Sequence, residues 1–265
     1  MLLVQMTDFH VAAAGSVLTE RYRTDERLAA AVAHVRALDP APDVVVCTGD
    51  LVDAGSAAEY ARLRELLRPL ASPVYVVPGN HDEREALRRA FADRGYFPAV
   101  GPLNYAVDVG PIRIVALDTN VPDSGGGRLG ADTLAWLDAT LAAAPDRPTV
   151  VVQHHPPMAT GIAWMDDMGL EDAAAEAAIV ARHPHVERIL CGHLHRPIAA
   201  RVGGTIASTC PSTAHQVALD LRRPGQLAIV AEPPAVQLHA WADGRLVSHV
   251  SYVGDYGVAD VVGGA

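Results

Sequence analysis

The chain has 265 residues, of which 50% are hydrophobic and 20% are charged, so it can bury a sizeable core and is not a disordered chain. It carries 21 Lys and Arg residues against 31 Asp and Glu residues, which gives a formal net charge of −10. This balance argues against a general binder of nucleic acids or anionic membranes, but it leaves open a small anionic substrate held by metal ions.

Short apolar runs alternate with helical segments over the first two thirds of the chain. The runs predict strands at 2–7, 43–48, 74–77, 112–117, 149–153 and 188–191. Alanine-rich segments with helical spacing predict helices at 25–38, 57–67, 84–91, 133–143 and 172–182. Alternation of this kind is typical of parallel strands in a layered α/β protein.

The pattern changes after Pro197. Short strand-like pieces follow at 205–208, 227–231, 236–241 and 246–252, with no clear helix between them. They predict a second, more antiparallel sheet packed on the first. We expect one domain over residues 1–265, with a core of about 1–200, a β-rich part of about 201–253 that completes the second sheet or forms an oligomer contact, and a loose tail at 254–265.

Cysteine content and the N-terminal sequence bear on the compartment. Cys47, Cys191 and Cys210 are too few and too widely spaced for a disulfide framework or a thiolate zinc site, so we expect buried packing residues. The N-terminus reaches Asp8 too early for a secretion signal, and no apolar run approaches the ~18 residues of a membrane span. These features predict a soluble cytoplasmic protein.

Polar residues that can bind metals follow five of the predicted strands. Three strands end in Asp8-Phe9-His10, Gly49-Asp50 and Gly79-Asn80-His81-Asp82. Two later strands end in His154-His155-Pro156-Pro157 and Gly192-His193-Leu194-His195. Ligands of open α/β sheets bind outside the carboxyl ends of the strands, and residues i and i+2 of an extended chain point to the same side. Packing alone does not explain this pattern.

These five blocks, in this order, resemble the signature of the calcineurin-like metallophosphoesterases, and the resemblance covers residues 1 to about 200. Within that superfamily the chain is similar to the class III cyclic nucleotide phosphodiesterases, and among them to the bacterial glycerophosphodiester phosphodiesterases. This finer resemblance rests on three segments, at 154–157, 161–166 and 213–216.

The resemblance implies a four-layer αββα sandwich that holds two metal ions. It assigns one ion to Asp8, His10 and His195, the other to Asn80, His154 and His193, and Asp50 to both. A set of oxygen and nitrogen ligands without thiolates suits Mn, Fe, Co or Zn. Two divalent ions, two carboxylates and one hydroxide leave about one positive charge, which suits an anionic phosphodiester.

The implied activity is hydrolysis of small organic phosphodiesters, such as glycerophosphodiesters, by a hydroxide that the two ions hold. Asp50 and His81 are the predicted catalytic residues, and His81 would bind the phosphate or protonate the leaving group. Asp82 would orient His81 or cap the next helix. 3′,5′-Cyclic nucleotides such as cyclic AMP stay an alternative substrate. A non-catalytic binding module is the remaining alternative, and the intact ligand set argues against it.

Several residues near the motifs have more than one interpretation. His155 is predicted to be structural, because only one member of an adjacent pair should face the ions, and His215 either lines the pocket or lies in a turn. The loop residues that could touch substrate are Arg21, Tyr22 and Ser56. A lid, a subunit contact and core packing are all open for Met158, Trp164, Met165 and Met168. Surface or helix-end positions are expected for His34, His183, His185, His239 and His249.

Overall fold

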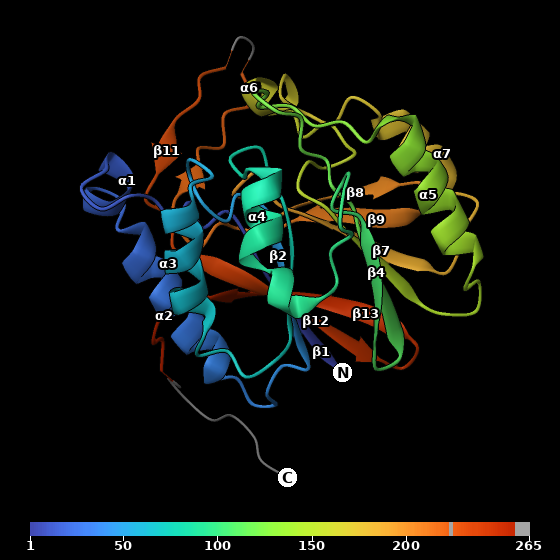
Figure 1. The fold of residues 1–265 in the computed structure, drawn as a ribbon, viewed down its shortest axis with the longest axis horizontal. Coiled ribbons are helices and arrows are strands. Elements are labelled where there is room, and N and C mark those ends of the chain that lie inside the picture. The colour runs from blue at the N-terminus through green and yellow to red at the C-terminus, as the bar shows by residue number, and fades with distance from the viewer. Residues whose placement is uncertain (223–224, 258–265) are drawn as a thin grey trace.

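The computed structural model describes residues 1–222 and 225–257. Two β-sheets lie between two groups of helices, with α2, α3 and α4 on one side and α5 and α7 on the other (Figure 1). None of the helices in these two ranges is long and apolar enough to cross a membrane.

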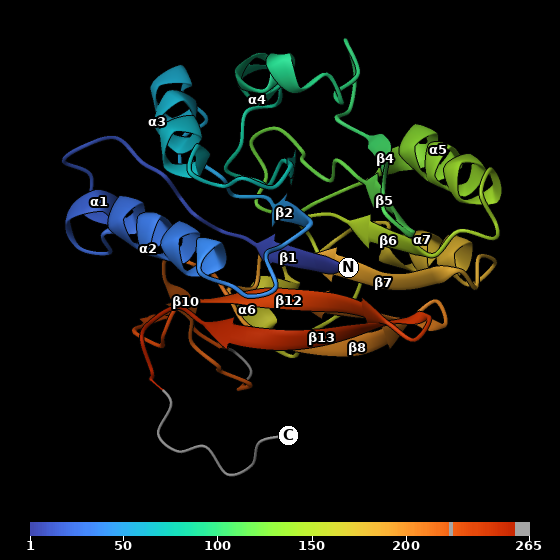
Figure 2. The same ribbon diagram turned by 90° about the horizontal axis from the view of Figure 1, so that it is seen from below.

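The first sheet contains the first three strands of the chain and the last two. Its order is β13 (Arg245–Tyr252), β12 (Ala235–Ala242), β1 (Leu2–Met6), β2 (Val44–Thr48) and β3 (Val74–Val77). The strands β1, β2 and β3 are parallel, whereas β12 runs antiparallel to both β1 and β13, as Figure 2 shows. Its outer face packs against α2 (Thr24–Arg36), α3 (Ala57–Leu67) and α4 (Arg84–Ala90).

The second sheet contains six strands. Its order is β4 (Tyr105–Val109), β5 (Ile112–Ala116), β6 (Thr149–Val152), β7 (Val186–Cys191), β9 (Thr205–Thr209) and β8 (Ile198–Val202). The four central strands are parallel, and the two edge strands are antiparallel to their neighbours. Its outer face packs against α5 (Gly130–Ala142) and α7 (Ala173–Val180).

Short elements fill the connections. They are α1 (Val17–Glu20), α6 (Ala163–Asp166), a 3₁₀ turn (Ala92–Arg94) and the hairpin strands β10 (Gln216–Val217) and β11 (Ile229–Val230). No helix was predicted where α1 and α6 lie, because helices of four residues show too little periodicity in a sequence.

Strands that are covered on both faces account for the runs of valine in the sequence. In β1, Leu3 faces the other sheet and Val4 faces the helices, because side chains alternate across a strand. The inner layer joins residues such as Val46 of the first sheet to Ile114 and Val150 of the second. The expected αββα sandwich is confirmed.

Strands are present after Pro197 as predicted, but they are divided between the two sheets. They do not form a separate second sheet; instead β8 and β9 extend one sheet, while β12 and β13 extend the other. The strand β12 covers an edge of β1 that would otherwise expose unpaired backbone groups. A strand pattern shows which face of a strand is buried but not which strand lies beside it, so the sequence left this pairing open. Residues 258–265 of the expected loose tail lie outside the described residues.

This pairing also corrects the prediction for His239. We expected a surface histidine, but His239 is fully buried between the sheets. Its ring nitrogens are 2.7 Å from the Ser248 hydroxyl and 3.2 Å from Gln5 Oε1. Burial lowers its pKa to about 3, so the imidazole is neutral there.

A carboxyl group is buried where α7 packs on the second sheet. Glu176 is fully buried; its Oε2 accepts a 3.0 Å hydrogen bond from Gln153 Nε2, and its Oε1 has no partner. Burial raises the pKa of Glu176 to about 8, although the bond from Gln153 acts in the opposite direction. The side chain is therefore protonated at neutral pH.

Replacement of Glu176 with glutamine should remove a pH dependence of stability. A group whose pKa rises on folding contributes fully to the free energy of unfolding below its ordinary pKa, which is 4.5 for Glu176. This contribution is lost as the pH rises toward 8. Between pH 5.5 and pH 8, the free energy of unfolding should therefore fall by roughly 3 kcal/mol more in the wild type than in Glu176→Gln. Urea denaturation at both pH values measures this difference, with the exposed Glu171→Gln as the control. An identical pH dependence in all three proteins would show that Glu176 ionises as freely as a surface carboxyl.

Candidate metal centre

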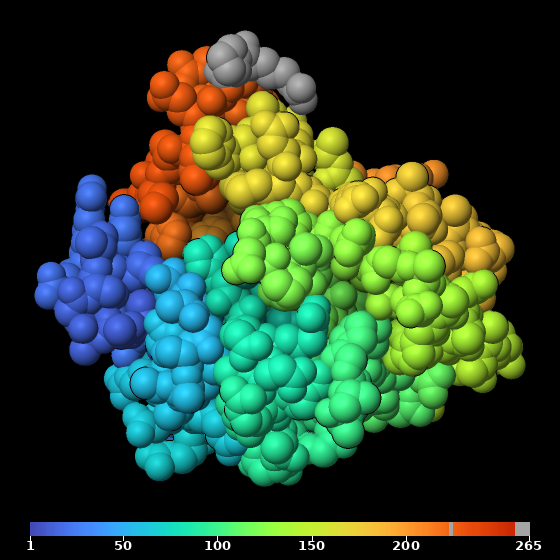
Figure 3. All heavy atoms as spheres, turned by 45° about the horizontal axis from the view of Figure 1, so that its top comes forward, coloured from blue at the N-terminus to red at the C-terminus, as the bar shows by residue number. Residues whose placement is uncertain are grey.

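The polar motifs meet at one edge of the sandwich. In Figure 3 the segments that follow β1 and β2 (blue), β5 (green) and β6 (yellow) gather on one face with the orange β10–β11 hairpin. Beyond the strand ends, Asp8 N–H donates to the Gly49 carbonyl and His10 N–H to the Asp50 carbonyl, both at 3.0 Å. The first two motifs are therefore aligned by a continuation of the parallel ladder.

The backbone of this edge is strained. Eight non-glycine residues of the described chain have a positive φ, and five of them are predicted metal ligands: Asp8, His10, Asp50, His193 and His195. Such a conformation costs on the order of 1–3 kcal/mol per residue and tends to persist at functional sites. The strain turns side chains that follow a strand back toward a common centre.

Two glycines of the motifs are required by close packing. A Cβ atom on Gly79 would lie 2.2 Å from Asp50 Oδ1, and one on Gly192 would lie 2.3 Å from Thr7 Oγ1. These distances explain why glycine precedes Asn80 and His193 in the sequence. A side chain at either place would displace the motif that packs against it.

The first cluster joins the ends of β1, β2 and β7. The ligand atoms of its members lie within 4.8 Å of one another, and the members are Asp8, His10, Asp50 and His195. The His195 Nε2 atom is 3.3 Å from both Asp8 Oδ1 and His10 Nε2. The His195 Nδ1–H donates to the His215 carbonyl at 2.6 Å, so the Nε2 lone pair faces the cluster.

The second cluster joins the ends of β2, β3, β6 and β7. The His154 Nε2 atom lies 3.1 Å from Asn80 Oδ1 and 3.5 Å from Asp50 Oδ2. Its Nδ1–H donates to the Thr48 carbonyl at 2.8 Å, which leaves the Nε2 lone pair free. In His193 the two ring nitrogens exchange these roles: Nε2–H donates to the Met168 carbonyl at 3.1 Å, and Nδ1 has no hydrogen bond to a carbonyl.

Asp50 lies between the two clusters. Its Oδ2 atom is 3.7 Å from His10 Nε2 on one side and 3.5 Å from His154 Nε2 on the other. The carboxyl group is almost completely buried. This is the placement that a carboxylate shared by two ions requires.

The pKa values of the predicted ligands show which groups are already in the protonation state that binds a metal ion. Burial raises the pKa of Asp50, but the charge of His154 outweighs it and holds that pKa well below its usual value. The pKa of Asp8 is lowered in the same way by His195. Burial, helped by the neighbouring His155, lowers the pKa of His193 far below its usual value. Burial lowers the pKa of His154, but Asp50 outweighs it and raises that pKa to about 9, and Asp8 raises the pKa of His195 in the same way. Metal binding needs ionised carboxylates and neutral imidazoles, so His154 and His195 give up a proton when a metal ion binds, whereas Asp8, Asp50 and His193 are already in the required state.

The donor set therefore fits two metal ions. Imidazole lone pairs, one amide oxygen and two carboxylates converge in a buried space, and the outer nitrogens of His154, His193 and His195 are fixed by backbone carbonyls. Carbonyl partners of this kind set the tautomer and the orientation of ligating histidines. The Nε2 atoms of His10 and His195 are only 3.3 Å apart. Two lone pairs at this distance repel unless a cation or a proton lies between them.

His155 lies beside the second cluster: one of its ring nitrogens is within 4.8 Å of ligand atoms of His154 and His193, but both of its nitrogens have other partners. Its Nδ1 is 2.8 Å from the Thr119 hydroxyl and its Nε2 is 3.1 Å from the Gly125 carbonyl. The ring also packs against Gly127, where a Cβ atom would lie 2.4 Å away. Both ring nitrogens are thus used in anchoring the loop after β5.

Alanine substitution should separate the two adjacent histidines. His154→Ala removes a lone pair from the second cluster and should lower metal affinity and lower activity by at least ~10²-fold. His155→Ala should retain both ions, because its nitrogens bond to Thr119 and Gly125. Metal analysis after dialysis, together with kcat, measures both effects. Retention of two ions by His154→Ala and loss of one by His155→Ala would reverse the assignment.

His81 lies beside the first cluster without joining it. Its N–H donates to Asp50 Oδ1 at 2.9 Å, and its ring is 4.7 Å from the ring of His10. The Nδ1–H donates to the Asp53 carbonyl at 2.9 Å, which leaves Nε2 on the opposite edge of the ring. Burial lowers the pKa of His81, but Asp53 and Asp50 outweigh it and raise that pKa to about 10.

Asp53 is a site residue that sequence reasoning missed. Its Oδ1 atom is 3.3 Å from His81 Nδ1 and 3.6 Å from His10 Nδ1. Bonds from both histidines hold the pKa of this carboxyl well below its usual range. The available signal was its place three residues after Asp50, in the same loop.

Neither interpretation of Asp82 was right. Its carboxyl group accepts bonds from the Leu51 and Gly79 N–H groups and from the Tyr60 hydroxyl, at 3.1, 2.9 and 2.9 Å. It therefore joins the loops after β2 and β3 and does not orient His81. The cap of α4 is Glu83, whose carboxylate accepts from the N–H groups of the first turn.

His215 lies next to the first cluster. Its ring centroid is 4.7 Å from that of His195 and 5.2 Å from that of His10, and its buried Nδ1 has no hydrogen-bond partner. The centroid of the Tyr22 ring lies 5.2 Å from that of His215, and the Arg21 guanidinium lies over the Tyr22 ring. His215 is therefore a buried neighbour of the first cluster.

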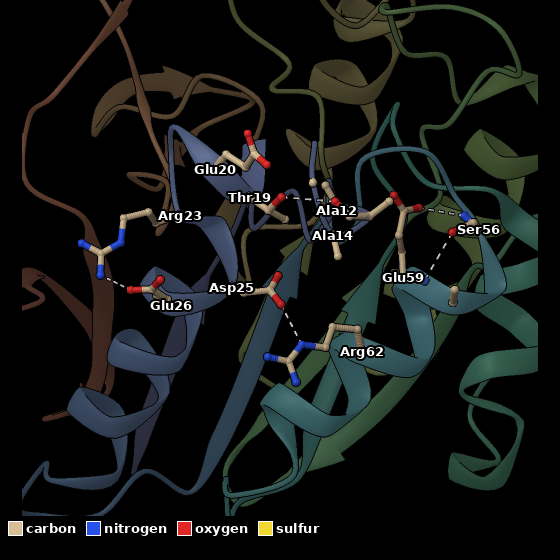
Figure 4. A pocket seen from close by; sticks show the side chains of 13 residues that line it. Ala12, Ala14, Thr19, Glu20, Arg23, Asp25, Glu26, Ser56, Glu59 and Arg62 are labelled. Atoms are coloured by element: carbon tan, nitrogen blue, oxygen red, sulfur yellow. Dashed lines mark hydrogen bonds and ion pairs between the residues drawn. The ribbon is translucent and has the colours of Figure 1, made fainter. Parts of the chain in front are cut away.

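A cavity of about 640 Å³ lies between α1, α2 and α3 (Figure 4). Ser56 lines it, but the Ser56 hydroxyl already accepts from Glu59 N–H as the cap of α3. None of the predicted ligands lines this cavity. In the loop after β6, Met165 is buried, Trp164 is 49% exposed and the Met168 carbonyl orients His193.

Two linked clusters of Asp, Asn and His at the edge of an αββα sandwich define a metallophosphoesterase. The chain belongs to the calcineurin-like phosphoesterase family, whose sequence profile matches residues 1–197.

Relatives of two kinds extend over almost the whole chain. The chain is 35% identical to a protein of Arcobacter nitrofigilis named as a probable glycerophosphodiester phosphodiesterase GpdQ, over 97% of this chain and 94% of the relative. It is 33% identical to the 3′,5′-cyclic adenosine monophosphate phosphodiesterase CpdA of Pseudomonas aeruginosa, over 96% of this chain and 91% of the relative. The crystal structure of a dimetal phosphatase from Danio rerio shares the fold at 14% identity, with a TM-score of 0.65 over 96% of this chain and 99% of that chain.

Proposed function

We propose that this protein is a phosphodiesterase that holds two transition-metal ions and hydrolyses small organic phosphodiesters, with glycerophosphodiesters as the main substrates. The observation that carries the proposal is Asp50 Oδ2, which faces a histidine nitrogen of each cluster at 3.7 and 3.5 Å. One ion is assigned to Asp8, His10, Asp50 and His195. The other is assigned to Asp50, Asn80, His154 and His193. Manganese, iron, cobalt and zinc suit such ligands.

When bound, two such ions lower the pKa of a shared water and offset the negative charge of the phosphoryl oxygens. The chain supplies the geometry around them. Asp50 fixes the two positions relative to each other, and the carbonyls of Thr48, Met168 and His215 fix three imidazoles. Because these groups are in place before substrate arrives, no reorganisation is needed during the reaction.

His81 is the proposed proton donor. Its Nδ1 side is fixed by Asp53, so the Nε2 side is available to the phosphate and the leaving oxygen. Its side chain is 38% exposed, which allows contact with a substrate. Protonation of a leaving alkoxide by a positioned side chain contributes about 10²–10⁴ in rate.

Cyclic AMP is the second candidate substrate. Relatives named as cyclic AMP phosphodiesterases match the chain at 33% and 31% identity, close to the 35% of the glycerophosphodiesterase relative. Both substrate classes present a singly charged phosphodiester to the metal centre, so the centre itself does not distinguish them. The distinction falls to residues that contact the alcohol groups.

A substrate panel tests the proposal. Protein of measured metal content should hydrolyse bis(p-nitrophenyl) phosphate, and removal of the metals should abolish this activity. Comparison of kcat/KM for glycerophosphoethanolamine and cyclic AMP then separates the two candidates. A higher value for cyclic AMP would replace the main proposal with the second one. Hydrolysis of neither diester by fully metal-loaded protein would favour a non-catalytic binding module.

A further inference from the structure

Strand β5 ends in a polar segment to which no predicted ligand belongs. Asp118, Thr119 and Asn120 follow this strand, and all three are buried. The Asn120 Nδ2 group donates to the Gly79 carbonyl at 2.6 Å and to the Asp82 carbonyl at 3.1 Å. These carbonyls bracket Asn80 and His81, so one side-chain amide closes the turn that carries a ligand and the proton donor.

An ion pair between the partly exposed Arg84 and the buried Asp118 holds Asn120 in place. Arg84 donates to both carboxylate oxygens of Asp118, at 2.6 and 3.1 Å, and to the Asn120 carbonyl at 2.8 Å. The Asp118 side chain is fully buried, and it also accepts the Asn120 N–H at 3.0 Å and the Leu103 N–H at 2.8 Å. Charge-assisted hydrogen bonds that converge on one buried carboxylate fix the positions of their donors firmly.

We infer that Asn120 is a positioning residue, which holds turn 79–82 so that Asn80 points to the second metal position and His81 to the substrate. This inference rests on the proposed function. A primary amide is suited to the place, because it offers two N–H donors on one atom to two carbonyl acceptors. The contact also joins the two sheets, since Asn120 follows β5 of one sheet and the turn follows β3 of the other. Loss of such an outer contact typically weakens metal affinity or activity by about 10–100-fold.

The test compares two substitutions of the same kind. Asn120→Asp keeps the shape of the side chain but turns a carboxylate oxygen toward the two carbonyls. Asn104→Asp is the matched control, because Asn104 belongs to the same network without contacting the turn. Its Oδ1 accepts from Asp118 N–H at 2.8 Å, and its Nδ2 donates to the Thr133 hydroxyl at 3.0 Å.

Metal-free proteins are titrated with Co²⁺ and followed by calorimetry and visible absorption, with unfolding temperatures measured in parallel. The wild type and Asn104→Asp should each bind two ions with the same affinities. Asn120→Asp should bind one ion as the wild type does and the other about 10–100-fold more weakly. Asn120→Ala removes both donors without adding charge and should show the same loss of affinity for one ion. This variant keeps the inference testable if Asn120→Asp does not fold.

Each of the other results overturns the inference. Two ions bound at wild-type affinity in the Asn120 variants would show that the amide does not position Asn80. Equal weakening in Asn104→Asp would show that the network only stabilises the fold. A wild-type protein that binds fewer than two Co²⁺ ions would overturn the proposed dinuclear centre and the inference that rests on it. The number of ions bound by the wild type therefore distinguishes this failure from a wrong role for Asn120 alone.

Discussion

Replacement of Asp50 with alanine should abolish activity and remove bound metal at the same time. One oxygen of this carboxylate faces both clusters, at 3.7 Å from His10 Nε2 and 3.5 Å from His154 Nε2. Without it each position loses a ligand, and two cations ~3.5–4 Å apart lose the negative charge between them. Several kcal/mol are at stake, so kcat/KM should fall by at least ~10³-fold. Metal analysis and the rate on bis(p-nitrophenyl) phosphate measure the two losses.

Two further substitutions serve as a comparison and a control for Asp50→Ala. Asp8→Ala should weaken mainly one ion, because Asp8 contacts His195 of the first cluster at 3.3 Å. Asp108→Ala changes an exposed carboxylate on β4 and should leave metal and activity unchanged. Two ions bound at wild-type affinity in Asp50→Ala would show that this carboxylate does not bridge. Equal loss of both ions in Asp8→Ala would show that the two positions are filled cooperatively.

The sequence was informative where a strand ends in a chemical motif. Apolar runs located the central strands of both sheets, because valine-rich segments covered on both faces differ strongly from the polar turns that follow them. Asp8, Asp50 and His193 could be placed from sequence because the strand ends converge on one edge. Strand β4 was not predicted; its side chains alternate between exposed positions and less exposed ones, as in an edge strand with one covered face.

Contacts between distant segments were not visible in the sequence. Asp53 and Asn120 lie in loop segments whose composition is typical of turns, and this composition does not show that they contact His81 and turn 79–82. The carbonyl partners of the ligating histidines have no sequence signature at all, because every residue carries a carbonyl group. Which imidazole nitrogen faces the centre therefore became clear only from the structure.

Strand pairing across the two sheets was also hidden. The Cα partners of β1 include Ala240 and His239, more than 200 residues along the chain. Such pairing depends on which edge is left open once the other strands have assembled. The burial of His239 followed from that pairing, which is why composition suggested a surface residue.

His81→Ala should separate metal binding from chemistry. The His81 ring touches Asp53 and His10 but belongs to neither of the two proposed ligand sets, so the variant should bind both ions. If the side chain acts in the transition state, kcat should fall more than KM rises. Measurement of metal content and of both kinetic constants tests these statements.

The size of the fall in kcat should depend on the leaving group. A p-nitrophenolate departs readily without a proton, so the variant should keep much of its activity on bis(p-nitrophenyl) phosphate. A glycerol or ribose alkoxide is far more basic and needs a proton to leave. On diesters that release such an alkoxide, kcat of the variant should fall by the full ~10²–10⁴ of general-acid catalysis. Asp53→Asn should reproduce part of this selective loss, because Asp53 fixes the Nδ1 side of the imidazole. Equal losses on both esters would show that His81 only positions the phosphate, and loss of an ion would make His81 part of the metal centre itself.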